Sequence, residues 1–116
     1  MKIVKLMDGK PQELTSKMFE GKVYRLPLID NQIAKEISVT MIKFDSGARN
    51  VFHTHTGEQV LYVTEGKGIV ANEDEEYVVT QGTAIYIPPG EHHWHGATED
   101  SSFSHLSILR PGETKF

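Results

Sequence analysis

Histidine is the residue type with the greatest chemical capacity in this sequence, and all six histidines lie between positions 53 and 105. His53 and His55 are two residues apart, so in a β-strand their side chains project from the same face. Two imidazoles that project together can bind one ion, because neutral imidazole is the commonest metal ligand in proteins. Gln59 has the same parity, although Gly57 makes a turn in between.

The alternative for this segment is that His53 and His55 are ordinary strand residues on a solvated face. Leu61 and Val63 continue the parity of Gln59 along the following strand, which indicates an apolar interior on that side. A solvated face needs no apolar companions at these positions. We therefore expect the two histidines and Gln59 to point into the fold.

A second segment, residues 82–96, brings more histidines after a strand and a turn. Pro88 and Pro89 end the strand because neither can donate a ladder hydrogen bond, and Gly90 permits a tight reversal. Three histidines and the single tryptophan follow: His92, His93, Trp94 and His95. One of these histidines is a candidate third nitrogen ligand, and the spacing alone does not choose among them.

His105 lies in the last expected strand, residues 103–109, and shares its parity with Phe103, Ser107 and Leu109. A histidine that faces a barrel interior near a metal ion is a candidate general base. Burial and the charge of the ion would both lower its pKa and favour the neutral, proton-accepting form. The alternative is a hydrogen-bonded core or surface histidine, and the sequence leaves both open.

The elements that would position these residues are short β-strands. Glycines punctuate the chain between runs rich in Val, Ile, Tyr, Phe and Thr, a rhythm typical of an all-β sandwich or barrel. We expect strands at 37–42, 59–64, 68–71, 76–79, 84–87 and 103–109. Only residues 11–18 are predicted to be helical, because Pro11 stands early and Glu13 falls in the first turn.

Composition and charge limit the kinds of function. The 116 residues suit one domain and include no cysteine, which excludes disulfides, thiolate metal sites and cysteine nucleophiles. Charges near the start leave no signal-peptide core, and no apolar run approaches membrane-spanning length, so we expect a cytoplasmic protein without a membrane partner. The net charge is −4 and no basic patch is present, which argues against nucleic acid as a partner. The acidic run 73–76 suggests a solvated hairpin tip.

The spacing of both histidine segments resembles the two sequence motifs of the cupin superfamily, G-x5-H-x-H-x3,4-E-x6-G and G-x5-P-x-G-x2-H-x3-N. The first motif is matched by Gly47, His53, His55, Gln59 and Gly66, and the second by Gly82, Pro88, Gly90, His93 and Ala97. Every spacing fits. The departures are Gln59, where the family usually has glutamate, and Ala97, where it usually has asparagine.

This resemblance implies an all-β double-stranded β-helix, or jelly-roll barrel. It implies one cupin domain over residues 1–116, with the barrel core at 40–110 and N-terminal strands and a turn at 1–35. It further implies that one divalent transition metal ion is bound by His53, His55, Gln59 and His93. His92 and His95 are then hydrogen-bonded or solvated side chains. These four ligands carry no charge, which leaves a more electrophilic ion, and without sulfur they suit Mn, Fe, Co, Ni, Cu or Zn.

Within the superfamily, the chain resembles the bacterial single-domain hydroxynitrile lyase-type cupins. The shared segments are His53-Thr54-His55 with Gln59, His93-Trp94-His95-Gly96 and Ser104-His105-Leu106. This resemblance implies manganese as the metal, His105 as the base, and Lewis-acid or lyase chemistry on a small hydroxylated or carbonyl compound. Two alternatives stay open: an oxygen-dependent dioxygenase at the same site, and a non-catalytic barrel that binds or senses a small molecule.

A homodimer is a further expectation. Small cupins commonly pair through their sheets, and residues 23–28, which are mostly apolar or aromatic, could supply an edge strand or an exchanged strand. The partners expected for the chain are therefore a second copy of itself and a small-molecule ligand or substrate.

Overall fold

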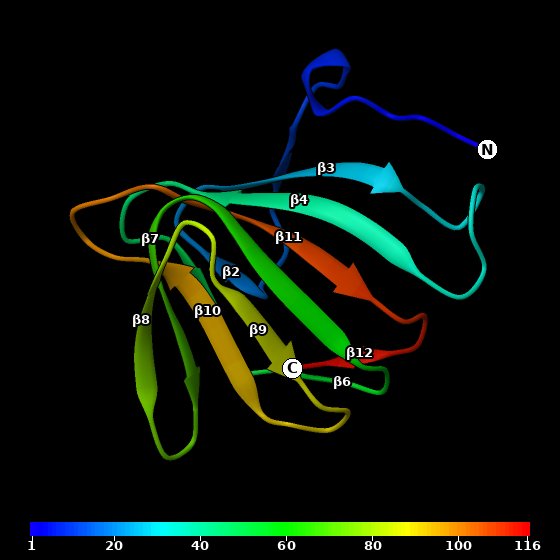
Figure 1. The fold of residues 1–116 in the computed structure, drawn as a ribbon. Helices are drawn as coiled ribbons and strands as arrows, with labels where there is room; N and C mark the ends of the chain where they lie inside the picture. Colours follow the sequence, from blue (N-terminus) through cyan, green and yellow to red (C-terminus); the bar gives the residue numbers. More distant parts are fainter.

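The computed structural model describes residues 1–116 and consists almost entirely of β-strands (Figure 1). In chain order the elements are η1 (Leu6–Asp8), β1 (Gln12–Leu14), β2 (Phe19–Glu20), β3 (Val23–Ile29), β4 (Ser38–Phe44), β5 (Arg49–Asn50), β6 (Thr54–His55), β7 (Gln59–Asn72), β8 (Glu76–Thr80), β9 (Ala84–Ile87), β10 (His93–Ala97), β11 (Phe103–Leu109) and β12 (Thr114–Lys115). Ten strands form one sheet that curves into a nearly closed barrel, while β12 pairs with β6. The expected all-β jelly-roll is confirmed.

Strand β7 joins the two walls of the barrel. It runs for 14 residues, where the sequence predicted separate strands at 59–64 and 68–71. Its first half pairs with β9 and β11, and its second half pairs with β8 and β10. Gly66 lies where β7 passes from the first pair of neighbours to the second, and its φ is 76°. A Cβ atom there would collide with the Ser102 carbonyl oxygen. Glycine therefore lets the strand bend from one wall into the other.

The helix predicted at residues 11–18 is wrong. Gln12–Leu14 instead forms β1, which pairs antiparallel with β3. This pairing satisfies backbone groups along the sheet and outweighs the weak local preference for a helical turn. The only helix is η1, with three residues, so the structure has no helix that could cross a membrane.

Strand β3 pairs with β4 along most of its length, while β1 covers its other side only at Val23–Arg25. The expectation of an edge strand at residues 23–28 is therefore wrong for Val23–Arg25, and the use of this segment as an exchanged strand stays a prediction. Val23 of β3 pairs with Phe44 of β4, and both side chains are fully buried. The homodimer itself stays a prediction.

The apolar core lies beside the histidine segments and holds them in place. Its ten buried members are Val23, Phe44, Ala48, Leu61, Val63, Val70, Val79, Ile87, Ala97 and Phe103. The Phe44 ring contacts two imidazoles, with ring centroids 5.8 Å from His95 and 5.7 Å from His105. Core packing therefore continues directly into the polar part of the interior.

Strand β10 is an element that the sequence did not predict. All five of its residues are buried, and they pair with β7 along the strand and with β5 at Gly96. Because side chains alternate along a strand, His93 and His95 share one face. The strand begins at His93, and His92 before it is exposed.

Candidate metal-binding site

Three histidines from the two segments converge inside the barrel. Ligand nitrogens of His53, His55 and His93 lie within 4.8 Å of one another. His53 and His93 also exchange two backbone hydrogen bonds, with N–O distances of 2.9 and 3.0 Å, so the two segments are joined at the site. Each of the three residues is at most 9% exposed. Three convergent imidazoles of this kind are a familiar set of protein ligands for one metal ion.

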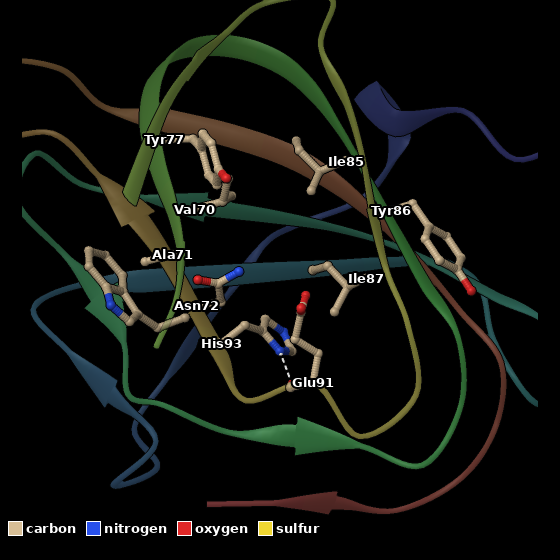
Figure 2. Close-up of a pocket in the computed structure, with 10 residues that line it drawn as sticks. Val70, Ala71, Asn72, Tyr77, Ile85, Tyr86, Ile87, Glu91 and His93 are labelled. Carbon is tan, nitrogen blue, oxygen red and sulfur yellow. Dashed lines mark hydrogen bonds between the residues drawn. The ribbon is translucent and has the colours of Figure 1, made fainter. Parts of the chain in front are cut away.

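The Nδ1 atom of each of these imidazoles has a partner outside the cluster. His53 Nδ1 donates to the Val51 carbonyl oxygen at 2.7 Å, and His93 Nδ1 donates to the Glu91 carbonyl oxygen at 2.8 Å (Figure 2). A carbonyl only accepts, so the proton of these two rings lies on Nδ1 and the lone pair on Nε2. His55 Nδ1 is 2.8 Å from the hydroxyl of Thr114 in β12. Such outer hydrogen bonds orient histidine ligands and set their tautomers.

Gln59 is held in the same manner by a side chain from another strand. Its Nε2 donates to the Ser107 hydroxyl at 2.8 Å, which leaves the amide oxygen Oε1 free. Gln59 is 4% exposed and lines the same cavity as His53 and His55. The carbonyl end of this amide is therefore available to a cation.

Buried donor atoms without a protein partner are concentrated at this site. The four such side-chain atoms in the structure are His55 Nε2, Gln59 Oε1, His93 Nε2 and His105 Nδ1. Buried polar atoms normally have partners, so this group of lone pairs needs an explanation. Three of the four belong to the residues expected to bind the metal, and a cation would satisfy all three.

Burial keeps these imidazoles neutral. It lowers the pKa of His53 to about 3 and that of His55 to about 4, and it also lowers the pKa of His93. The neighbouring histidines lower these pKa values further, since two protonated rings would repel each other. Neutral imidazole is the form that binds metal, so near pH 7 the three rings are ready to accept an ion.

A cavity of about 120 Å³ adjoins the cluster. Its lining residues are Met18, Phe19, Ile42, Asn50, His53, His55, Gln59, His95, His105, Ser107 and Leu109. We call it the histidine cavity. Its wall combines apolar side chains with imidazole and amide groups, which is typical of a small-molecule site. His93 is not among its lining residues and lines a second cavity instead.

His105 and His95 form a buried pair at the histidine cavity. His105 Nε2 lies 3.1 Å from His95 Nδ1, while His105 Nδ1 has no partner. Burial lowers the pKa of His105 to about 4 and that of His95 well below its ordinary value. Asn50 accepts a hydrogen bond from the His95 backbone N–H at 2.8 Å and holds its Nδ2 beside the His95 ring. His105 is therefore neutral near pH 7, with one nitrogen unused by the protein.

His92 lies apart from the cluster. It is exposed, its Nδ1 is 2.9 Å from a carboxylate oxygen of Glu73, and its ring stacks on Phe52 with centroids 4.7 Å apart. Of the histidines for which the sequence allowed either a hydrogen-bonded or a solvated state, His95 is buried and hydrogen-bonded and His92 lies at the surface.

Several residues that shape the site were missed by the sequence analysis. Met18 ends the segment predicted to be helical, Phe19 follows it directly in β2, and Asn50 precedes the first histidine pair. Thr114 is 59 positions from His55, and no local pattern connects them. Ser107 did carry a signal, because it shares the parity of His105, but a serine alone does not indicate a ligand partner.

Comparison with known proteins identifies the family. The cupin domain model matches residues 40–109. The chain is a cupin. This cupin is 36% identical over 93 residues to an (R)-mandelonitrile lyase of Granulicella tundricola, and the match covers 78% of this chain and 70% of that protein. It is 30% identical over 96 residues to an uncharacterized protein of Methanocaldococcus jannaschii, covering 80% of this chain and 74% of that one.

Solved structures agree with this assignment. A cupin-like protein of Thermotoga maritima superimposes with a TM-score of 0.81 and 31% identity, covering 87% of this chain and 81% of that one. The polyketide cyclase RemF of Streptomyces resistomycificus superimposes with a TM-score of 0.89 over 99% of this chain and 84% of that one. Its identity is 23%, so this likeness shows the fold alone.

Proposed function

We propose that this cupin binds one divalent metal ion through His53, His55, Gln59 and His93, and catalyses a lyase reaction on a small hydroxylated compound. The observation that carries the proposal is the set of inward donor atoms without a partner, on side chains whose other polar atom is fixed. A buried polar group without a partner costs free energy, and one cation would satisfy these atoms together.

The proposed metal is manganese and the proposed reaction is the cleavage of a cyanohydrin. Nitrogen and oxygen donors do not by themselves rank the transition metals, so manganese follows from the resemblance to lyase-type cupins. The relationship to an (R)-mandelonitrile lyase supports a carbon–carbon lyase reaction. A divalent cation in this site would supply a Lewis acid that polarises a substrate oxygen. Because Gln59 is neutral where many cupins have glutamate, the ligand set would leave the full charge of the cation.

His105 is the proposed base. Its Nδ1 is buried without a partner, and the residue lines the histidine cavity. Nδ1 can accept a proton only if Nε2 carries the ring proton, in which case Nε2 donates to His95 Nδ1. Asn50 and Phe44 hold the His95 ring from two sides, so His95 acts as a positioning residue for this tautomer.

In the proposed cleavage the substrate hydroxyl gives its proton to His105 Nδ1. The carbon–carbon bond to the nitrile then breaks, and its electron pair leaves with cyanide while the former hydroxyl oxygen becomes a carbonyl oxygen. His105 returns the proton to cyanide, so the products are an aldehyde and hydrogen cyanide. The apolar wall residues Phe19, Ile42 and Leu109 suit a substrate with a small hydrocarbon group.

The test is anaerobic turnover of mandelonitrile by protein loaded with Mn²⁺, measured as benzaldehyde formation. We expect activity that disappears on chelation and returns with added Mn²⁺. Turnover without oxygen separates a lyase from a dioxygenase, which would consume oxygen with an enolate or catecholate substrate. Absence of cyanohydrin cleavage by the Mn, Fe, Co, Ni, Cu and Zn forms would overturn the lyase assignment.

The variant His105→Ala separates the base from the metal ligands. We expect turnover to fall by about a hundredfold or more, the usual scale of general-base catalysis, while metal content stays stoichiometric. His105 is fully buried, so His105→Gln, which fills more of the space, guards against a folding defect. Loss of metal in both variants would show that His105 is a ligand or a structural residue.

We also propose that the protein is a cytoplasmic homodimer. Small cupins commonly pair through their sheets, and the edge strand β1 is short and exposed at Gln12 and Glu13. Sedimentation across micromolar concentrations is expected to give twice the mass of the 13.0 kDa chain. A monomer mass throughout that range would contradict the dimer.

A further inference from the structure

A second cavity lies on the other side of His93, between β8 and β9 (Figure 2). Its volume is about 210 Å³. Strand β7 pairs with β8 along one half and with β9 along the other, and the two partner strands diverge where the cavity opens. None of its lining residues except His93 belongs to the proposed metal site, so we treat it as separate and call it the tyrosine cavity.

The tyrosine cavity has an apolar interior. Val70, Ile85 and Ile87 line it, and seven of its ten lining residues are hydrophobic. A dry cavity of roughly 150 Å³ lined by such side chains can hold a benzene molecule. The tyrosine cavity is therefore large enough for one aromatic ring with a short side chain.

One tyrosine ring stands at the edge of this cavity. Figure 2 shows the Tyr77 ring on the β8 side, whereas the Tyr86 ring projects from the opposite face of β9 to Ile85 and Ile87, away from the cavity. Tyr77 is 50% exposed, although it lies on the same face of β8 as the buried Val79. An accessible ring beside an apolar pocket suits a cationic group, because a ring face attracts a cation.

Glu91 is the one acidic residue that lines the tyrosine cavity, and the other non-hydrophobic lining residues are Asn72 and His93. The Glu91 carboxylate points into the cavity next to Ile87 (Figure 2). The Tyr77 hydroxyl donates to Glu75, and this bond raises the pKa of Tyr77, with burial and the charges of Glu75 and Glu91 acting in the same direction. No lysine or arginine lines the cavity. The local charge is therefore complementary to a cation and repels an anion.

We propose that the tyrosine cavity binds a small organic cation, a single aromatic ring or short alkyl group that carries an ammonium group. The apolar part lies between Val70 and Ile85, and the ammonium group lies near Glu91 and the face of the Tyr77 ring. The site differs from the histidine cavity in its lining and charge. It requires neither a metal ion nor turnover, so its test is independent of the lyase proposal.

The test is a titration of the metal-loaded protein with 2-phenylethylamine, which is protonated at neutral pH. Trp94 lines the cavity and is the single tryptophan of the chain, so its fluorescence reports occupancy. We expect a saturable change at constant ionic strength. The matched anion 3-phenylpropionate and the neutral 2-phenylethanol carry the same ring, and both should bind at least about tenfold more weakly if charge selects the ligand. The same titration after chelation is expected to give the same affinity.

Two variants locate the binding. Glu91→Gln removes the charge while keeping the backbone carbonyl that holds His93, and it should weaken 2-phenylethylamine binding by about tenfold. Glu76→Gln is the matched control, because it makes the same change in net charge at a neighbouring residue that does not line the cavity. Tyr77→Leu should also weaken the amine more than the alcohol, since it removes a ring face. Unchanged affinity in both Glu91→Gln and Tyr77→Leu would overturn the proposal, as would equal binding of the anion or loss of binding on chelation.

Discussion

The segment at 91–95 contains neighbouring histidines that differ in almost every physical respect. His93 lies inside the barrel, is 3% exposed and meets His53 and His55. His92 stands on the outside, where it bonds Glu73 and stacks on Phe52. The difference arises because β10 begins at His93 and its two-residue period sends His93 and His95 inward.

This contrast shows that histidine count alone says little about the site. What separates the two residues is whether both ring nitrogens have protein or solvent partners. His92 is open to water, whereas His93 uses Nδ1 for the Glu91 carbonyl and leaves Nε2 buried and unsatisfied. An inward imidazole with one fixed and one free nitrogen is the arrangement expected of a metal ligand.

The largest expected effect comes from removing the inner histidine. His93→Ala should abolish stoichiometric metal binding, with a loss of affinity beyond the roughly hundredfold upper range for an outer hydrogen-bond partner. His92→Ala is the matched control, and it should leave metal content unchanged because an exposed pair of this type contributes little. Metal analysis after gel filtration, with circular dichroism to check folding, measures both. Equal metal loss in the two variants would contradict the assignment of His93, and not His92, as a metal ligand.

Acid should destabilise the metal-free protein through the inner histidines. The folded pKa values are about 3 for His53 and about 4 for His55 and His105, below the ordinary value of 6.5. The unfolded chain therefore binds more protons below pH 6.5, so stability is complete above that pH and falls as the pH drops from 6.5 toward 4. The slope should be about 1 kcal/mol per pH unit for each such histidine.

Urea unfolding of the chelated protein between pH 8 and pH 5 measures this effect. His92→Ala should follow the same curve, since His92 is exposed in the folded state. A free energy of unfolding that stays constant from pH 7 to pH 5 would show that the inner histidines remain accessible to protons in the folded state.

Gln59→Glu tests how the absence of charge on the ligands affects metal affinity and turnover. A carboxylate would attract the cation more strongly, and Ser107 could donate its hydroxyl to it. We expect metal affinity to rise by about tenfold and turnover to fall by a similar factor, because the added charge makes the ion a weaker Lewis acid. Competition with a metallochromic indicator and the mandelonitrile assay measure the two changes. A rise in both affinity and turnover would contradict this account.

Much of this arrangement is predictable from the sequence because strands have a two-residue period. That period placed His53 and His55 on one face, and it placed His105 beside Ser107, with which it lines the same cavity. It could not choose among His92, His93 and His95, because they follow a turn whose geometry decides where the next strand begins. The motif resemblance favoured His93, and the structure brings that residue to the cluster.

The errors have the same physical origin, since they depend on contacts between distant segments. Residues 11–18 carry local helix signals, but pairing with β3 makes part of them a strand. Gly66 and Gly68 suggested a break, whereas β7 continues through them because Gly66 permits a bend. The contact between Asn50 and His95 likewise depends on the pairing of two distant strands, β5 and β10.

The smallest expected effect, a change in metal affinity alone, concerns Thr114, the most distant of these contacts. Its hydroxyl lies 2.8 Å from His55 Nδ1, and β12 pairs with β6 at these two residues. Thr114→Val keeps the shape but removes the hydrogen bond, so metal affinity should fall by about tenfold, the lower range for an outer partner. Thr114→Ser retains the hydroxyl and should restore it, whereas Lys115→Ala on the adjacent exposed residue should have no effect. Equal affinities of the valine and serine variants would mean that β12 only covers the site; recovery by serine alone would show that the His55 tautomer depends on this hydroxyl.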